Sequence, residues 1–180
     1  MKTYLKEMIK KYLFRYTSMG RPLYDFNVEP IQLTALINEF ERLKKTEGCI
    51  CEIGVARGST TKFLAEHITL QGEANNQIYY AIDTFSSFTA EDMEHEVKHR
   101  GKKLSEIRGF EYNDYDAWSS NFRDKSFIKP IKADCSKFDY SSISPIKMSF
   151  LDVDLYLPTK GALPKLYDAT TIGGVILVDD

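Results

Sequence analysis

The amino-acid sequence predicts an α/β protein built on a doubly wound parallel sheet with the strand order 3-2-1-4-5. Short apolar runs alternate along the chain with helical patterns, which is typical of repeated strand–helix–strand units. A loop with two glycines follows the first run, at residues 54–58, and acidic residues end the second, fourth and fifth runs. Because parallel strands share their carboxyl-end edge, these features predict a Rossmann-like sheet with a ligand site at that edge.

Residues 1–47 precede the first predicted strand and are expected to form a helical segment, followed by one sheet domain over 48–180. Apolar residues recur at helical spacing through residues 1–20. Pro30 suits the first turn of a second helix that stops near Gly48. These helices cover a sheet edge, or they contribute to a substrate pocket or a dimer contact. The sequence leaves these alternatives open.

The first predicted strand and the loop after it form the central motif of the chain. Cys49 to Ile53 is a short apolar run between glycines, typical of a strand buried on both faces. A helix follows in which residues 59–61 can cap the first turn. Glycine lets a ligand approach the backbone, and the helix start offers free N–H groups. The candidate ligand-binding residues here are Glu52, Gly54, Gly58, Ser59 and Thr60.

The glycine spacing of this motif narrows the class of ligand. Glu52-x-Gly54-x-x-x-Gly58 is neither the dinucleotide fingerprint nor a P-loop. It favours a nucleotide-like ligand without a pyrophosphate, although a glycine turn between any buried strand and a helix would look similar. Residues 78–83 are the second predicted strand, and Asp83 ends it where such sheets place a carboxylate against ribose hydroxyls. The alternative is an ordinary aspartate that caps the next turn.

Residues 89–126 are the least regular part of the sequence. A charge-dense stretch at 91–100 predicts a solvated helix, and aromatic residues follow between Phe110 and Trp118. An insertion placed after the second strand can fold over a ligand as a lid. It can equally be a surface excursion whose aromatic side chains pack into the core.

Three further strands complete the predicted sheet. The third covers residues 127–134, where Pro130 indicates an edge strand, and Asp134 and Cys135 lie at its carboxyl end. The fourth covers 148–154 and leads to a helix that begins at Pro158, with Pro164 expected to kink that helix or shift its start. A turn at Gly173-Gly174 precedes the fifth strand, residues 175–178.

Four carboxylates follow the fourth and fifth strands: Asp152, Asp154, Asp179 and Asp180. Like charges this close repel one another unless they are neutralised. A hard cation such as Mg²⁺ prefers carboxylate oxygens and would neutralise them. Asp152 and Asp154 point the same way if the strand is still extended there. The alternative is a solvated acidic rim without a metal.

Composition excludes several classes of protein. The chain has 180 residues, enough for one domain with a real core, and a formal net charge of −2, which gives no reason to expect a nucleic-acid partner. No long apolar span and no signal peptide are present, so we expect a cytoplasmic protein without a membrane partner. The three cysteines are expected to be buried, reduced thiols.

Motifs in two parts of the sequence resemble a class of methyltransferases and one family within that class. The stretch around Glu52 and its two glycines resembles the first motif of class I S-adenosylmethionine (SAM)-dependent methyltransferases. The C-terminal part resembles the macrocin O-methyltransferase family, which includes sugar O-methyltransferases. The motifs that carry this resemblance are the run from Phe150 to Lys160, Ala162-Leu163, Leu166-Tyr167, Gly173-Gly174 and Val178-Asp179-Asp180. The resemblance covers residues 48–88, through Ile82-Asp83-x-Phe85, and 127–180.

The resemblance implies an enzyme that transfers a methyl group from SAM to a hydroxyl of a small molecule or sugar moiety. It implies Mg²⁺ held by Asp152, Asp179 and Asp180, and Asp154 as the base that takes the hydroxyl proton. The residues that it assigns to SAM are Glu52, Gly54, Gly58, Ser59, Thr60, Asp83, Phe85, Asp134 and Cys135.

The sequence differs from this class of methyltransferase in one feature, and two other functions are considered. Methyltransferases of this class usually continue past the fifth strand, whereas this sequence ends at Asp180. We therefore expect either a C-terminally incomplete domain or a homo-oligomer that closes the sheet. A non-catalytic SAM-binding or interaction module is the main alternative function. A nucleotide-sugar or NAD oxidoreductase is disfavoured because G-x-G-x-x-G and a Tyr-x-x-x-Lys pair are absent.

Overall fold

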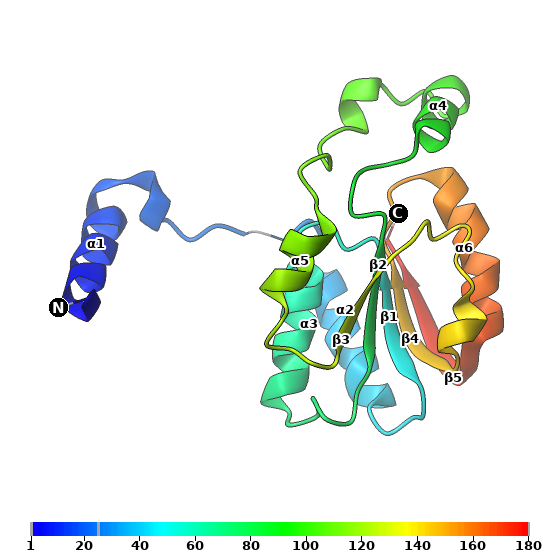
Figure 1. Cartoon of the computed structure of the whole chain (residues 1–180), viewed down its shortest axis with the longest axis horizontal. Helices are drawn as coiled ribbons and strands as arrows, with labels where there is room; N and C mark the ends of the chain where they lie inside the picture. Colours follow the sequence, from blue (N-terminus) through cyan, green and yellow to red (C-terminus); the bar gives the residue numbers. More distant parts are fainter. Residues whose placement is uncertain (1, 25, 180) are drawn as a thin grey trace.

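A computed structural model describes residues 2–24 and 26–179, and strands alternate with helices over most of this length (Figure 1). Within these residues a five-stranded sheet runs in the order β3-β2-β1-β4-β5, and every neighbouring pair is parallel. The fold class and strand order expected from the sequence are therefore confirmed. The strands are β1 (Cys49–Ile53), β2 (Tyr79–Asp83), β3 (Ile128–Lys132), β4 (Ile146–Leu151) and β5 (Thr170–Val178).

Helices cover both faces of this sheet, as a doubly wound fold requires. Figure 1 shows α2, α3 and α5 on one face and α6 on the other. The α-helices are α1 (Lys2–Tyr16), α2 (Pro30–Leu43), α3 (Ser59–Leu70), α4 (Ala90–His99), α5 (Tyr115–Asn121) and α6 (Tyr156–Ala169). Short 3₁₀ helices are η1 (Ser18–Gly20), η2 (Leu104–Glu106) and η3 (Tyr140–Ile143).

The sheet separates two apolar cores because side chains of a strand alternate between its faces. In β1, Ile50 packs with Leu36 and Phe40 of α2 on one face. Cys51 and Ile53 pack with Leu166 of α6 on the other. All five residues of β1 are buried, as predicted for a central strand, and the cysteines are free, buried thiols. Burial raises the pKa of the Cys135 thiol to about 12, so this thiol stays protonated and unreactive.

The edge strands differ in how well the sequence predicted them. β3 lies at one edge, where Pro130 needs no ladder N–H, as expected. β5 begins at Thr170, five residues before the predicted start. Gly173 and Gly174 thus lie inside the strand rather than in a turn before it. The pairing register shifts there, between Ile146 and Met148 of β4, and Gly173 has φ +81°. Glycines here permit a bulge instead of a turn.

The junction between β4 and α6 also differs from the prediction. β4 ends at Leu151, three residues earlier than expected, and Asp154 has a left-handed φ of 59°. Helix α6 begins at Tyr156, two residues before Pro158, and continues through Pro164 to Ala169. Proline is tolerated in the first turn of a helix because the N–H groups there have no partner within the helix. Pro158 therefore marks the first turn of α6 and not its first residue.

Helix α1 stands apart from the sheet and its helices (Figure 1). Its apolar side chains are exposed, among them Leu5, Met8, Ile9 and Tyr12. Helix α2, in contrast, packs four buried residues against the sheet, so it covers a face of the sheet. No helix among the described residues is long and apolar enough to cross a membrane.

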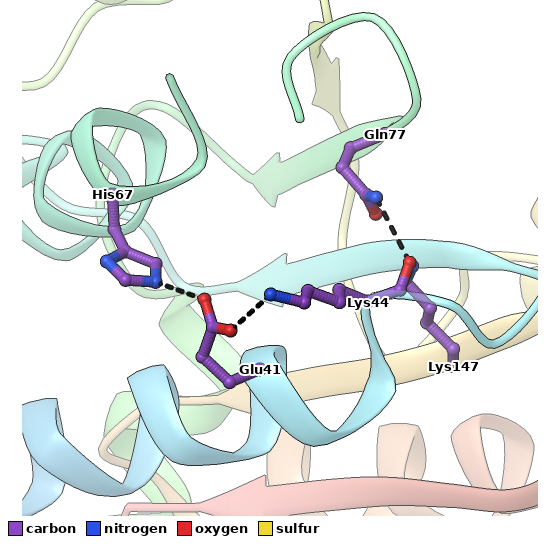
Figure 2. A network of polar contacts seen from close by, with 5 residues as sticks. All are labelled: Glu41, Lys44, His67, Gln77 and Lys147. Carbon is purple, nitrogen blue, oxygen red and sulfur yellow. Dashed lines mark hydrogen bonds and ion pairs between the residues drawn. The ribbon is translucent and has the colours of Figure 1, made fainter. Parts of the chain in front are cut away.

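A polar network joins α2, α3 and the amino ends of the strands, opposite the predicted ligand edge (Figure 2). Glu41 pairs with His67 at 2.9 Å and with Lys44 at 2.6 Å. The backbone carbonyl of Lys44 accepts hydrogen bonds from Gln77 at 3.5 Å and from the buried Lys147 at 3.4 Å. Burial lowers the pKa of the Lys147 ammonium. The network gives two donors to the carbonyl of Lys44, the C-cap residue of α2, where a helix end leaves carbonyl groups unsatisfied.

Candidate active site

A cavity of about 680 Å³ opens at the carboxyl ends of the strands, where the chain order reverses between β1 and β4. This is where open α/β sheets bind ligands, and the volume is typical of a small-molecule site. The loops after all five strands reach it. The predicted site residues that line it are Glu52, Gly54, Ser59, Thr60, Asp83, Asp134, Cys135, Asp152, Asp154 and Asp179.

The glycine loop after β1 needs both of its glycines, for reasons of packing. Gly54 and Gly58 have φ of +81° and +85°. A Cβ on Gly54 would lie 1.7 Å from the backbone oxygen of Asp152, so the loop touches the chain at the end of β4. A Cβ on Gly58 would lie 2.8 Å from the ring of Phe122. Gly58 is absent from the cavity lining and packs against this ring instead.

Helix α3 begins beside the cavity. Its N-cap is Gly58, which makes no side-chain capping bond, so the expected caps at Ser59, Thr60 and Thr61 are wrong. The Thr61 hydroxyl donates to Glu52 instead, at 2.5 Å. Ser59 and Thr60 line the cavity at the first turn, where backbone N–H groups have no helical partner. This end of α3 therefore suits an anionic or polar part of a ligand.

Glu52 is buried beneath this loop, with 1% of its surface exposed. Its carboxylate accepts hydrogen bonds from Thr61 and from the Tyr79 hydroxyl, the latter at 2.6 Å. Burial raises the pKa of Glu52 to about 7, although these two hydrogen bonds act in the opposite direction. The geometry favours a role in supporting the loop over direct contact with a ligand.

Asp83 joins β2 to the same loop. One carboxylate oxygen accepts hydrogen bonds from the backbone N–H groups of Val55 at 2.8 Å and Ala56 at 3.3 Å. The other accepts from the N–H of Phe85 at 2.7 Å. The Thr84 hydroxyl lies 3.4 Å from this second oxygen, but its one proton is better placed for the Ser87 carbonyl at 2.9 Å. A carboxylate has about four acceptor sites, so Asp83 holds the loop with three of them and keeps one for a ligand hydroxyl. Both alternatives from the sequence, ribose contact and turn cap, are compatible with this geometry.

Phe85 and Asp134 have local structural partners. Phe85 is buried and packs edge-on against Tyr115 and Trp118 at 5.2 and 5.4 Å, so it does not line the cavity. Asp134 does line it, and its carboxylate accepts from the Ser136 hydroxyl at 2.7 Å and pairs with Lys137 at 2.8 Å. Partial burial raises the pKa of Asp134, but these hydrogen bonds outweigh it and lower the pKa overall.

Three of the four acidic residues after β4 and β5 lie at the cavity, and the fourth, Asp180, lies outside the described residues. Asp152, Asp154 and Asp179 all line it. The Asp152 N–H donates to Ile53 at 2.8 Å and the Asp179 N–H to Leu151 at 3.0 Å, so sheet pairing holds both backbones. Asp152 and Asp154 were expected to point the same way if β4 stayed extended through them. β4 ends at Leu151 and Asp154 has a left-handed φ, so this expectation does not apply.

The metal assignment rests on residues that the structure places only in part. Asp180 lies outside the described residues. Over residues 2–24 and 26–179, no group of three His, Cys, Asp or Glu side chains is arranged to hold a metal ion. Asp152 and Asp179 still bring two carboxylates to one cavity, and carboxylate oxygens are the donors that Mg²⁺ prefers. The donor type fits this ion.

Two walls of the cavity were not predicted from the sequence. One includes Tyr24 and Phe26 before α2 and Gln32 in its first turn, and the side-chain amide of Gln32 donates to Asp179. The other includes Arg108 and Tyr112 in the irregular segment after α4. Residues 24–32 of the N-terminal segment thus contribute to the cavity, and whether the cavity binds a substrate stays a prediction. The insertion at 89–126 buries Trp118 in the core and lines the cavity with residues such as Arg108; its role as a lid stays a prediction.

A model of the family described as macrocin-O-methyltransferase (TylF) matches residues 31–180. The chain belongs to this family. No curated protein matches it. The resemblance noted in the sequence is thereby confirmed, and membership makes the protein an O-methyltransferase, so an oxidoreductase is ruled out. Residues 89–126, which the sequence motifs did not cover, fall within the family match.

Solved structures confirm the fold of a family member. The calicheamicin methyltransferase CalS11 is 16% identical and has a TM-score of 0.69, with 99% of this chain and 77% of that chain covered. The O-methyltransferase NovP is 17% identical with a TM-score of 0.68, covering 100% and 84%. An apo structure of CalS11, described as a TDP-rhamnose 3'-O-methyltransferase, is 14% identical with a TM-score of 0.61, covering 99% and 78%.

Proposed function

We propose that this O-methyltransferase transfers the methyl group of SAM to a hydroxyl group of a small molecule, with a sugar moiety as the leading acceptor. The observation that carries the proposal is that one cavity contains both the glycine loop of a nucleotide-like site and the acidic residues Asp152, Asp154 and Asp179 after β4 and β5. A donor and an acceptor held together there would react as if in one molecule, which supplies much of the rate. A sugar acceptor is supported by the similar fold of a TDP-rhamnose 3'-O-methyltransferase.

The SAM half of the cavity would lie over β1 and β2. Asp83 would accept a hydrogen bond from a ribose hydroxyl with its remaining acceptor site. The first turn of α3, at Ser59 and Thr60, would face a charged or polar part of SAM. Asp134 and Cys135 would form the wall at the end of β3.

The acceptor half would lie between the carboxylates and the walls formed by Tyr24 and Tyr112. Asp154 would take the hydroxyl proton as the oxygen attacks the methyl carbon of the sulfonium. The bond between that carbon and sulfur would break, and S-adenosylhomocysteine, a neutral thioether at sulfur, would leave. Asp152 and Asp179, with Asp180 as the third ligand implied by the family, would hold Mg²⁺. When bound, such an ion lowers the pKa of a substrate hydroxyl and orients its oxygen.

Methyl transfer from labelled SAM tests this proposal. The full chain would be incubated with methyl-labelled SAM and TDP-rhamnose, and in parallel with simple glycosides, each with Mg²⁺ or with excess chelator. We expect label in an acceptor, with a rate that chelation lowers. Label with equal rates under both conditions would overturn the role of the metal. An absence of label with every acceptor, together with an absence of SAM binding, would overturn the proposed cofactor.

A further inference from the structure

The loop that carries Asp154 adopts a backbone conformation that needs support. Asp154 has φ 59°, a left-handed conformation that residues with a Cβ atom rarely adopt, although aspartate adopts it more readily than most. Conformations of this kind persist only when neighbouring contacts hold them. Within the loop, the Leu155 N–H donates to the Val153 carbonyl at 2.7 Å, which closes a tight turn. Further support comes from another part of the chain.

Helix α4 supplies this support through a buried carboxylate. Glu96 is 1% exposed, although most residues of α4 face solvent. Its Oε1 accepts a hydrogen bond from the backbone N–H of Tyr156 at 2.8 Å. Tyr156 is the first residue of α6, two residues after Asp154, so Glu96 binds one of the N–H groups that a helix start leaves unpaired. A carboxylate is especially favourable at that end of a helix.

Lys102 adds a second contact between the same two segments. Its Nζ donates to the backbone carbonyl of Asp154 at 2.9 Å and lies 3.6 Å from Oε2 of Glu96. The backbone N–H of Lys102 donates to the carbonyl of Glu96 at 3.2 Å, which fixes the lysine beside the carboxylate. Glu96 and Lys102 therefore hold the loop on both sides of Leu155.

Ring packing strengthens this junction. The Tyr156 ring stacks with His95 at 5.5 Å and an angle of 12°, and the Arg100 guanidinium lies 5.2 Å from its centre. Figure 1 shows α4 above the carboxyl ends of the strands, beside the start of α6. The N-terminal end of α4 reaches the cavity through Thr89 and Asp92. One short helix thus joins the cavity wall to the loop of Asp154.

We propose that Glu96, aided by Lys102, is a positioning residue that holds the 153–156 loop so that the Asp154 carboxylate faces the methyl acceptor. The inference rests on the proposed role of Asp154 as the base. Glu96 itself does not touch the reacting atoms. A displacement of about 1 Å at a reacting group can lower a rate about 100-fold, so loss of the Glu96 contact acts on kcat more than on SAM binding.

The test compares Glu96→Ala, Glu96→Gln and a control, Glu94→Ala, in the full chain. Glu94 lies on the same helix but is exposed and pairs only along the helix, with Lys98. Amide exchange of Tyr156 would be measured by NMR, SAM affinity by calorimetry, and kcat with the best acceptor from the labelling experiment. We expect Glu96→Ala to speed Tyr156 exchange about tenfold or more and to lower kcat about 10- to 100-fold, with SAM affinity unchanged. Glu96→Gln keeps an oxygen acceptor for the Tyr156 N–H and should restore most of both losses.

The inference would be overturned if Tyr156 exchanged as slowly in Glu96→Ala as in Glu94→Ala, or if it exchanged faster in Glu96→Ala while kcat stayed unchanged. It would also be overturned if Glu96→Ala lowered SAM affinity, kcat and thermal stability equally and Glu96→Gln restored none of them. If Glu96→Ala does not fold, Lys102→Met provides the same readouts, with smaller losses expected because the Tyr156 bond remains. If the wild type neither binds SAM nor transfers a methyl group, the proposed function fails separately, and Tyr156 exchange still shows whether Glu96 holds the loop.

Discussion

At the scale of single residues, the cavity contains carboxylates to which different roles are assigned. Asp154 is assigned to proton removal and Asp152 to Mg²⁺ binding, and both line the same cavity. We expect Asp154→Asn to lower turnover about 10²–10⁴-fold, the usual cost of losing a general base, while Mg²⁺ affinity stays nearly intact. Asp152→Asn should instead weaken Mg²⁺ binding, and excess metal should partly restore the rate. Metal titration and single-turnover methyl transfer on both variants separate the two roles, and recovery of Asp154→Asn by excess Mg²⁺ would show that they are reversed.

The buried carboxylate of Glu52 should make the stability of the fold depend on pH. Its pKa is 4.5 in a solvated chain and about 7 in the fold, chiefly because burial disfavours the charged form. Between these pH values the folded protein keeps a proton that the unfolded chain has lost. The stability contributed by Glu52 is therefore fully present below about pH 4.5 and is lost as the pH rises through about 7. Each pKa unit corresponds to about 1.4 kcal/mol, so the total change is up to about 3 kcal/mol.

Glu52→Gln removes this titration and keeps an acceptor for Thr61 and Tyr79. We expect the free energy of unfolding of the variant, relative to the wild type, to rise by up to about 3 kcal/mol between pH 4.5 and 8. Urea unfolding of both proteins at several pH values measures this difference. A difference that does not change with pH would mean that Glu52 ionises normally within the fold.

At the scale of elements, the close contact between the glycine loop and the end of β4 should make a side chain at Gly54 costly to stability. Gly54→Ala places a Cβ 1.7 Å from the Asp152 backbone oxygen, and that backbone is held by sheet hydrogen bonds. Gly72 is a matched control, because its φ of +74° is similar but no atom lies within 4 Å of its Cβ position. Gly72→Ala should cost about 1–2 kcal/mol from the left-handed backbone alone. Gly54→Ala should cost clearly more by urea unfolding, and equal costs would show that the loop moves freely away from β4.

Elements with strong local signals were predicted well. β1 has an apolar run between glycines, and α2 has apolar spacing that begins at Pro30. The errors arose where one residue type serves two purposes. Gly173 suggested a turn, but it permits a bulge within β5. Pro158 suggested the first residue of a helix, but proline is tolerated anywhere in the first turn, and α6 begins two residues earlier. Tertiary pairing decides such cases, and a single sequence does not display it.

At the scale of the whole molecule, parallel topology explains why much of the site was predictable. Acidic residues more than 60 positions apart, such as Asp83 and Asp152, meet because every strand ends at the same edge. The missed walls, around Tyr24 and Arg108, come from segments without periodic spacing, so nothing in the sequence tied them to that edge. The insertion at 89–126 carried a clue in its aromatic residues, but its path depends on contacts such as that of Glu96 with Tyr156.

The exposed edge of the sheet at β5 should promote self-association. Among the described residues β5 pairs only with β4, and Ile172 is fully exposed along it, with Tyr167 exposed on the preceding helix. An unpaired apolar strand edge is a template for pairing with another chain. We expect light scattering to show dimers or larger species that Ile172→Lys reduces, with Ile31→Lys, an exposed position on α2, as a control. A monomeric wild type at high concentration would contradict this expectation.

The central claim, that the cavity at the carboxyl ends of the strands binds SAM, is tested most directly by calorimetric titration of SAM into the wild type and Asp83→Ala. Asp83 supports the glycine loop and is assigned to the ribose hydroxyls, and hydrogen bonds to charged groups contribute about 1.5–3 kcal/mol each. Asp139→Asn is the control, because Asp139 caps η3 and does not line the cavity. We predict saturable binding of one SAM per chain, unchanged in Asp139→Asn and weakened at least about tenfold in Asp83→Ala. No binding by the wild type, or equal affinity in all three proteins, would contradict the claim.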